Sequence, residues 1–158
     1  MVELAVDCRC ELGEGPIWDD RTGRLLFVDI NGHAVHVYDP QSGAHDVHDT
    51  GEYVSAIALS DDGAYLIARQ HDIARFDVAS GVGGRLARVE GDRADTRFND
   101  GCVDTRGRFW AGTMDDAERA PTGHLYRLDP DLRLTRFEAG FTVTNGRNGF
   151  SREYAPAR

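Results

Sequence analysis

Residues Ile17–Asp29 read IWDDRTGRLLFVD, and this stretch decides the fold because its pattern recurs twice further along the chain. The second copy is Ala58–Ala68 (ALSDDGAYLIA) and the third is Cys102–Gly112 (CVDTRGRFWAG). In each copy an apolar run is followed by a polar turn ending in glycine, and then by a second apolar run. Glycine adopts positive φ at low cost, and the Asp or Ser before it bonds back to the local backbone. Each copy therefore predicts a β-hairpin.

The spacing of the copies predicts a propeller. Their turn glycines, Gly23, Gly63 and Gly107, are separated by 40 and 44 residues. Propeller repeats of about 40–45 residues carry four strands per blade. A third strand is expected after each hairpin, at residues 35–40, 73–77 and 124–130, followed by a turn and an alternating fourth strand. We predict an all-β chain of about three blades with no internal domain boundary.

The end of the chain departs from the pattern. A fourth repeat begins at Thr144-Asn145-Gly146, but residues 147–158 show no apolar strand and no Asp-Gly hairpin. We interpret residues 1–146 as the N-terminal half of one propeller domain and 147–158 as an atypical tail, of the kind that a frameshift or an artificially ended reading frame produces. Because propellers close with about 4–8 blades, an incomplete ring is expected. Its open sheet edges would favour poor folding, aggregation or self-association.

Composition excludes several classes of protein. The 158 residues are 41% hydrophobic and 28% charged, which is typical of a globular chain. A formal net charge of -9 argues against nucleic acid and anionic membranes as partners. No stretch approaches the ~20 apolar residues of a membrane helix, and charges interrupt any apolar core in the first dozen residues. A cytoplasmic location is expected.

Three polar side chains are predicted to converge on one mouth of the propeller channel. Glu14 lies nine residues before Gly23, Asn99 lies eight before Gly107, and Asn145 takes the corresponding place in the fourth repeat. Each would stand at the entry to an innermost strand. A carboxylate with amide carbonyls suits a hard cation such as Ca²⁺, Mg²⁺ or Mn²⁺. The alternative is that these side chains only bond turn backbone, and the spacing does not decide between the two.

A cation and a long loop lie beside the same mouth. The guanidinium of Arg97 could bind substrate oxygens in a fixed fork, or it could form an ion pair with Asp95 or Asp100. Residues 115–122 form the longer loop of the third repeat. Such a loop either covers a site or is a tolerated surface insertion.

The cysteines and histidines give weaker indications. The three cysteines, Cys8, Cys10 and Cys102, do not suggest a disulfide framework. Cys8 and Cys10 alternate as strand residues do, so their side chains are expected on the same side. No histidine has zinc-site spacing with a cysteine. We interpret all six as surface residues: His33, His36, His45, His48, His71 and His124.

Four motifs stand in order along the chain: Leu12–Trp18 (LGEGPIW), Arg97–Gly101 (RFNDG), Gly112–Met114 (GTM) and Thr144–Gly146 (TNG). Together they resemble the regucalcin/gluconolactonase family, also called the senescence-marker-protein family, from about residue 5 to residue 146. The resemblance implies a six-bladed propeller that holds one divalent metal ion (Ca, Zn, Mn or Mg) in its channel. It also implies hydrolysis of a sugar lactone, although some members are described mainly as calcium-binding proteins.

The resemblance also assigns residues. It makes Glu14 and Asn145 metal ligands, and Arg97 and Asn99 substrate contacts. An acidic substrate contact follows the Gly-Thr-Met motif, where Asp115, Asp116 and Glu118 are candidates and Asp116 is our choice. The family's general base is an aspartate, also a metal ligand, in a later blade that this chain does not contain. No catalytic residue is therefore expected here, and residues 3–10 would be a ring-closing strand without its partner.

Three functions follow from these observations. The first is metal-dependent hydrolysis of a sugar lactone by the intact family fold. The metal would polarise the ester carbonyl, a base would activate water, and Arg97 with Asn99 would orient sugar hydroxyls. The second is a non-catalytic, calcium-binding propeller. The third is that the chain is an inactive fragment of the enzyme.

Overall fold

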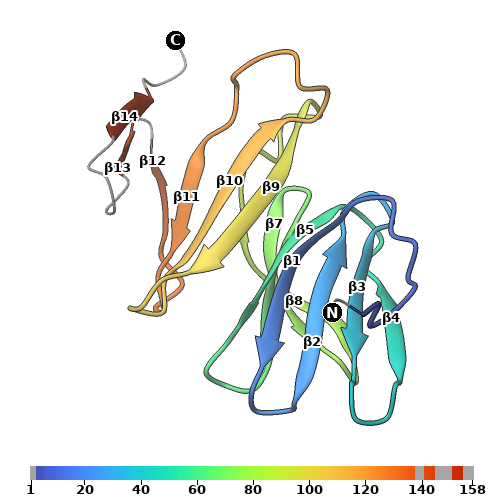
Figure 1. Ribbon diagram of the computed structural model, residues 1–158. Coiled ribbons are helices and arrows are strands. Elements are labelled where there is room, and N and C mark those ends of the chain that lie inside the picture. Colours follow the sequence, from blue (N-terminus) through green and yellow to red (C-terminus); the bar gives the residue numbers. More distant parts are fainter. Residues whose placement is uncertain (1–2, 138–140, 145–150, 155–158) are drawn as a thin grey trace.

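The computed structural model describes residues 3–137, 141–144 and 151–154, which form three four-stranded antiparallel sheets and one short hairpin (Figure 1). The first sheet contains β1 (Gly13–Asp19), β2 (Arg24–Asp29), β3 (Ala34–Tyr38) and β4 (His45–Asp49). The second contains β5 (Val54–Leu59), β6 (Tyr65–Arg69), β7 (Asp72–Asp77) and β8 (Gly81–Arg88). The third contains β9 (Thr96–Val103), β10 (Phe109–Asp115), β11 (Leu125–Leu128) and β12 (Leu134–Phe137). Strands β13 (Phe141–Thr144) and β14 (Ser151–Tyr154) pair with each other.

The three predicted hairpins are confirmed. Gly23, Gly63 and Gly107 all have positive φ, at 67°, 91° and 72°. The amide of Gly63 donates to the Ser60 carbonyl, and that of Gly107 donates to the Asp104 carbonyl. The turn residues therefore act as the sequence indicated. Third and fourth strands follow each hairpin, so every repeat forms one meandering sheet.

The structure bears on the predictions for both ends of the chain, residues 3–10 and the segment after residue 146. Residues 3–10 form no strand in the structure, so the expected N-terminal strand is wrong. Among the residues that the structure describes, no strand pairs with this segment, and a strand depends on its partner's hydrogen bonds. Strand β14 lies within the segment predicted to be an atypical tail. The nature of that tail stays a prediction.

Two apolar cores join the sheets. The first lies between the first two sheets and includes Leu26, Val35 and Phe76. The second lies between the second and third sheets and includes Phe98 and Phe109. The first strands of the four-stranded sheets lie in a row, with β5 in contact with β1 on one side and β9 on the other. The sheets thus stack face to face with their first strands together, as in a propeller-type fold, which agrees with the expected all-β architecture. Within the described residues, no helix has the length and hydrophobicity needed to cross a membrane.

Close packing between β9 and β10 gives a first prediction. A Cβ atom on Gly101 would lie 2.8 Å from the Trp110 carbonyl oxygen and 2.9 Å from Phe109 Cζ. Gly101→Ala should therefore lower the free energy of unfolding by about 1–3 kcal/mol, as overpacking does. Gly112, on the paired strand, has open space around its Cβ position and serves as the control. Urea unfolding of the two alanine variants checks this, and equal stability would contradict it.

Candidate functional site

The first strand of each four-stranded sheet carries an irregularity in its pairing with the second strand. In β9, Asp100 opposes Gly112 and Phe98 opposes Thr113, so Asn99 between them has no partner. The register of β1 shifts between Glu14 and Ile17, and that of β5 shifts between Val54 and Ala56. A bulge bends a strand and re-aims the side chains beside it. Glu14 is the last paired residue before the irregularity of β1, and Asn99 is the unpaired residue within that of β9, so both predicted residues lie at such a bend.

The entry to β1 is held by the buried carboxylate of Asp29. This carboxylate accepts hydrogen bonds from the amides of Glu11 and Leu12, both at 2.9 Å, and from Gly32 at 3.1 Å. Burial would raise the pKa of Asp29, but these backbone donors outweigh it and lower the pKa. Asp29 is therefore an anion that fixes the backbone just ahead of the Gly-Glu-Gly-Pro motif.

The Glu14 side chain is exposed to solvent. Gly15, at φ 56°, allows the backbone to turn directly after it. Within the described part of the chain, no hydrogen bond or ion pair engages the Glu14 carboxylate, so it does not bond turn backbone there. A free carboxylate at a fixed position is a suitable oxygen ligand for a divalent cation. Asn145, its expected partner ligand, lies outside the described residues.

The structure brings the three predicted substrate contacts together. Arg97 is only 6% exposed. Its Nε donates to Asp116 Oδ1 at 2.8 Å, and its Nη1 lies 3.4 Å from Asn99 Oδ1. Nη1 also donates to the Phe98 carbonyl at 3.0 Å. The guanidinium is thus held in one orientation, and its ion-pair partner is Asp116 rather than Asp95 or Asp100.

The loop after β10 distinguishes the acidic candidates. Asp115 is buried, and its carboxylate accepts hydrogen bonds from the amides of Ala117 and Ala120 at 2.9 and 3.1 Å. Asp115 therefore shapes the loop. Asp116 is partly exposed beside Arg97, whereas Glu118 is exposed at φ 55°. In Figure 1 this loop lies at the end of the third sheet where β9 begins. The geometry agrees with the choice of Asp116, whose role stays a prediction.

Sequence reasoning missed a buried acid beside this loop. Glu90 Oε1 accepts hydrogen bonds from Tyr126 Oη and His124 Nδ1 at 2.8 Å and from Thr113 Oγ1 at 3.0 Å. Burial would raise the pKa of Glu90, yet hydrogen bonding to Thr96 and to these three donors lowers it overall. Burial and the bond to Glu90 raise the pKa of Tyr126. The network joins the segment after β8 to β10 and β11. No motif marked Glu90 in the sequence.

The interpretation of every histidine as a surface residue is wrong for His36. This residue lies on β3, between Val35 and Val37, and is 5% exposed. Its Nε2 is 3.7 Å from Cys10 Sγ, although the two residues are 26 positions apart. Cys8 and Cys10 do lie on the same side, as predicted, with their sulfur atoms 3.4 Å apart.

With this geometry in place, comparison with known proteins identifies the family. The sequence profile of the SMP-30/Gluconolactonase/LRE-like region matches residues 12–153. The chain belongs to this family. The match includes the entry to β1, the Arg97 motif and part of the segment predicted to be atypical, and it confirms the resemblance drawn from the four motifs.

Individual relatives of the family support the same assignment. The chain is 36% identical to the pentonolactonase XacC of Haloferax volcanii, over 96% of this chain and 50% of that protein. It is 34% identical to regucalcin of Gallus gallus, over 92% of this chain and 52% of that one. A 6-deoxy-6-sulfogluconolactonase of Pseudomonas putida is 33% identical, over 85% and 46%. The chain thus spans about half the length of the curated relatives it matches.

A solved structure shares the fold. The calcium-binding protein regucalcin of Agrobacterium tumefaciens matches with a TM-score of 0.78 at 27% identity, over 92% of this chain and 50% of that one. A gluconolactonase of Xanthomonas campestris matches with a TM-score of 0.65 at 20% identity, over 92% and 59%, which supports the fold alone.

Proposed function

We propose that residues 1–146 form the N-terminal half of a propeller domain, six-bladed in its family, whose function is metal-dependent hydrolysis of a sugar lactone. The observation that carries this proposal is the group formed by Arg97, Asn99 and Asp116. The exposed Glu14 carboxylate beside the irregularity of β1 adds to it. Relatives named as lactonases of sugar acids favour the same substrate class.

Each residue has a role in this proposal. Glu14 and Asn145 would hold one divalent ion, which when bound would polarise the ester carbonyl. Arg97, buried and fixed by Asp116, would present its remaining N–H groups to sugar hydroxyls, and Asn99 would add an amide beside it. This orients the lactone ring before water attacks. We assign the general base to no residue of this chain.

The test is an assay of lactone hydrolysis with and without metal. The purified protein is stripped with a chelator, and proton release from a gluconolactone and a pentonolactone is followed after adding Ca²⁺, Zn²⁺, Mn²⁺ or Mg²⁺ separately. Because we assign no general base within this chain, we expect slow hydrolysis that disappears with chelator and returns with at least one ion. Hydrolysis that chelator leaves unchanged would contradict metal dependence, and no hydrolysis with any ion would contradict a lactonase function for this chain.

A second candidate is a non-catalytic, calcium-binding function. It is favoured by the relative from Agrobacterium tumefaciens, which is described as a calcium-binding protein. Stoichiometric binding of Ca²⁺ without hydrolysis of either lactone would support it, and the absence of both would favour an inactive chain. Self-association through sheet edges, a cytoplasmic location and the lack of nucleic-acid or membrane partners stay predictions.

The fixed guanidinium gives a further prediction. Arg97→Lys keeps the charge but cannot contact Asp116, Asn99 and the Phe98 carbonyl together. A lysine is a point charge without the planar fork. We expect kcat/KM for the lactone to fall by roughly 100-fold, since small misplacement of a positioning group has effects of this size.

The matched control is Arg75→Lys, because Arg75 forms an exposed ion pair with Asp62 on the second sheet. Its kcat/KM should stay at the wild-type value. Steady-state kinetics on both variants would decide, and equal kcat/KM for Arg97→Lys and wild type would remove Arg97 from the substrate site.

A further inference from the structure

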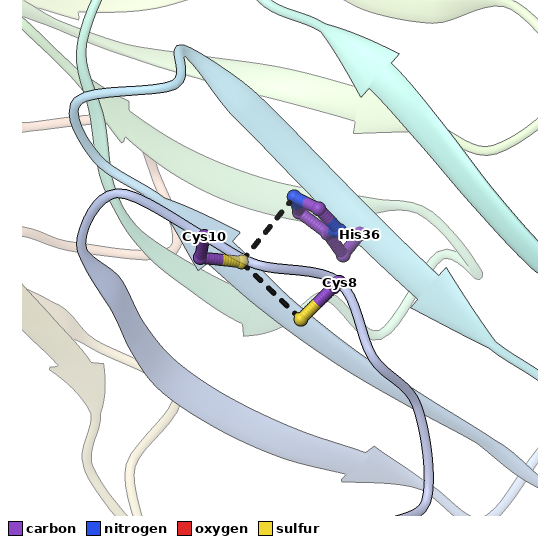
Figure 2. Close-up of side chains that lie close together, drawn as sticks. All are labelled: Cys8, Cys10 and His36. Atoms are coloured by element: carbon purple, nitrogen blue, oxygen red, sulfur yellow. Dashed lines mark hydrogen bonds between the residues drawn. The ribbon is translucent and has the colours of Figure 1, made fainter.

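Two cysteines and a histidine meet at a place that the proposed lactonase function does not use. Cys8 and Cys10 come from the segment before β1, and His36 comes from β3 (Figure 2). Cys10 Sγ lies 3.4 Å from Cys8 Sγ and 3.7 Å from His36 Nε2. The three ligand atoms all lie within 4.8 Å of one another. Each cysteine is half-buried and the histidine is buried.

These spacings resemble the edges of a zinc tetrahedron. With Zn–S bonds of 2.3 Å and Zn–N bonds of about 2.0 Å, two thiolates on one ion lie about 3.8 Å apart, and a thiolate and an imidazole nitrogen about 3.5 Å apart. The observed distances of 3.4 and 3.7 Å differ from these by a few tenths of an ångström. The third pair of ligand atoms, those of Cys8 and His36, lies within 4.8 Å. Side-chain rotations that bring this pair closer by up to about 1 Å would place one ion between the three atoms.

The histidine is already oriented as a ligand. Its Nε2 faces Cys10, while its Nδ1 lies 2.9 Å from His45 Nε2. Metal-bound imidazoles usually donate their second ring N–H to an acceptor, which fixes the tautomer. The His36 ring also stacks on Phe27, with centroids 4.7 Å apart. Packing and the His45 contact together leave Nε2 aimed at the two sulfurs.

The backbone between the cysteines is unusual. Arg9 has a φ of 49°, a left-handed conformation that is uncommon outside glycine. In an extended strand, residues two apart on one face are separated by about 6.6 Å. Arg9 departs from this extended geometry, and the two sulfurs lie 3.4 Å apart beside His36. Unfavourable backbone conformations of this kind cluster at ligand sites.

We propose that Cys8, Cys10 and His36 bind one Zn²⁺ ion, with water in the fourth position, and so fasten the segment before β1 onto β3. Two thiolates and an imidazole form a donor set that selects zinc over calcium or magnesium, which prefer oxygen. The site is therefore distinct from the oxygen ligands proposed for the lactonase metal. Burial, and then the neighbouring Cys8, raise the pKa of Cys10, so the ion must displace a thiol proton.

Cobalt is the probe that tests the proposal. The full chain is reduced, freed of metal and titrated with Co²⁺, whose bonds to thiolate give an intense charge-transfer absorption that oxygen ligands do not give. We expect one equivalent to produce this band and Zn²⁺ to abolish it by displacement. Zn²⁺ should also raise the melting temperature, because a ligand that binds only the folded state stabilises it.

Variants locate the ion. Cys8→Ser and Cys10→Ser should each lose the band, while Cys102→Ser, which alters the exposed third cysteine, should keep it. Glu14→Gln should also keep it, which separates this site from the proposed lactonase site. Circular dichroism of the metal-free variants shows whether they fold. Absence of the band in the reduced wild type, or its survival in folded Cys10→Ser, would overturn the proposal. So would a reduced pair that binds no ion but closes to a Cys8–Cys10 disulfide in air.

Discussion

Replacing Glu14 with glutamine is expected to reduce metal-dependent lactone hydrolysis by about 1,000-fold, because a bound metal contributes several kcal/mol of transition-state stabilisation. The neutral amide keeps the shape of the side chain but removes the charge that attracts the cation. Within the described residues the Glu14 carboxylate has no other partner, so the variant should fold with wild-type stability. The measurements are kcat/KM, the amount of bound metal and the melting temperature.

The control for Glu14 is Asp20→Asn. Asp20 is also an exposed acid of the first hairpin, but it lies in the turn at the other end of β1. It should retain both metal and activity. If Glu14→Gln keeps its activity and its metal, Glu14 is not a ligand. If both acidic variants lose activity equally, the effect belongs to the general charge of the protein and not to one site.

The fold was predictable because its signals are local. The turn glycines at 23, 63 and 107 fix three hairpins, and the alternation of side chains after them fixes the remaining strands. Arg97 is an example of a contact that these local signals predict only in part. Once β9 is paired with β10, Arg97 lies opposite Met114, and the acid two residues further on comes within reach. The ion pair between Arg97 and Asp116 can therefore be predicted only once the register of β9 against β10 is known.

Other parts of the site depend on contacts that no local pattern encodes. The irregularities at Glu14 and Asn99 change the register by one residue. The sequence indicated them only through the separation from the turn glycine, which is nine residues for Glu14 and eight for Asn99. His36 is buried because β3 packs on both faces, as its apolar neighbours Val35 and Val37 could have suggested. The proximity of His36 to Cys8 and Cys10 depends on the path of the segment before β1. The alternation of residues in that segment wrongly predicted a strand.

The second large effect concerns stability and centres on Asp19, at the end of β1. Its carboxylate is fully buried and accepts hydrogen bonds from Arg21, Thr22 and Tyr65. Tyr65 belongs to β6, so its 2.7 Å bond joins the first sheet to the second across 46 residues of sequence. The Arg21 guanidinium is the main cause that holds the pKa of Asp19 far below its usual value, against the opposing effect of burial. Asp19 is therefore ionised in the folded protein at neutral pH.

Asp19→Asn should lower the free energy of unfolding by about 3 kcal/mol. The substitution replaces one carboxylate oxygen with an N–H₂ group, so some of the buried donors around it lose their acceptor. Since the folded pKa lies below the unfolded value of about 3.9, the carboxylate contributes fully above that pH and less as the pH falls through the folded pKa. The stability gap between wild type and variant should thus be widest near neutral pH and narrow below about pH 4. Urea unfolding across this range measures it, with Asp39→Asn as the control. Within the described residues, the Asp39 carboxylate accepts hydrogen bonds inside a single turn, so its gap should be much smaller than that of Asp19→Asn. A gap that does not change with pH would show that the charge of Asp19 is not what joins the two sheets.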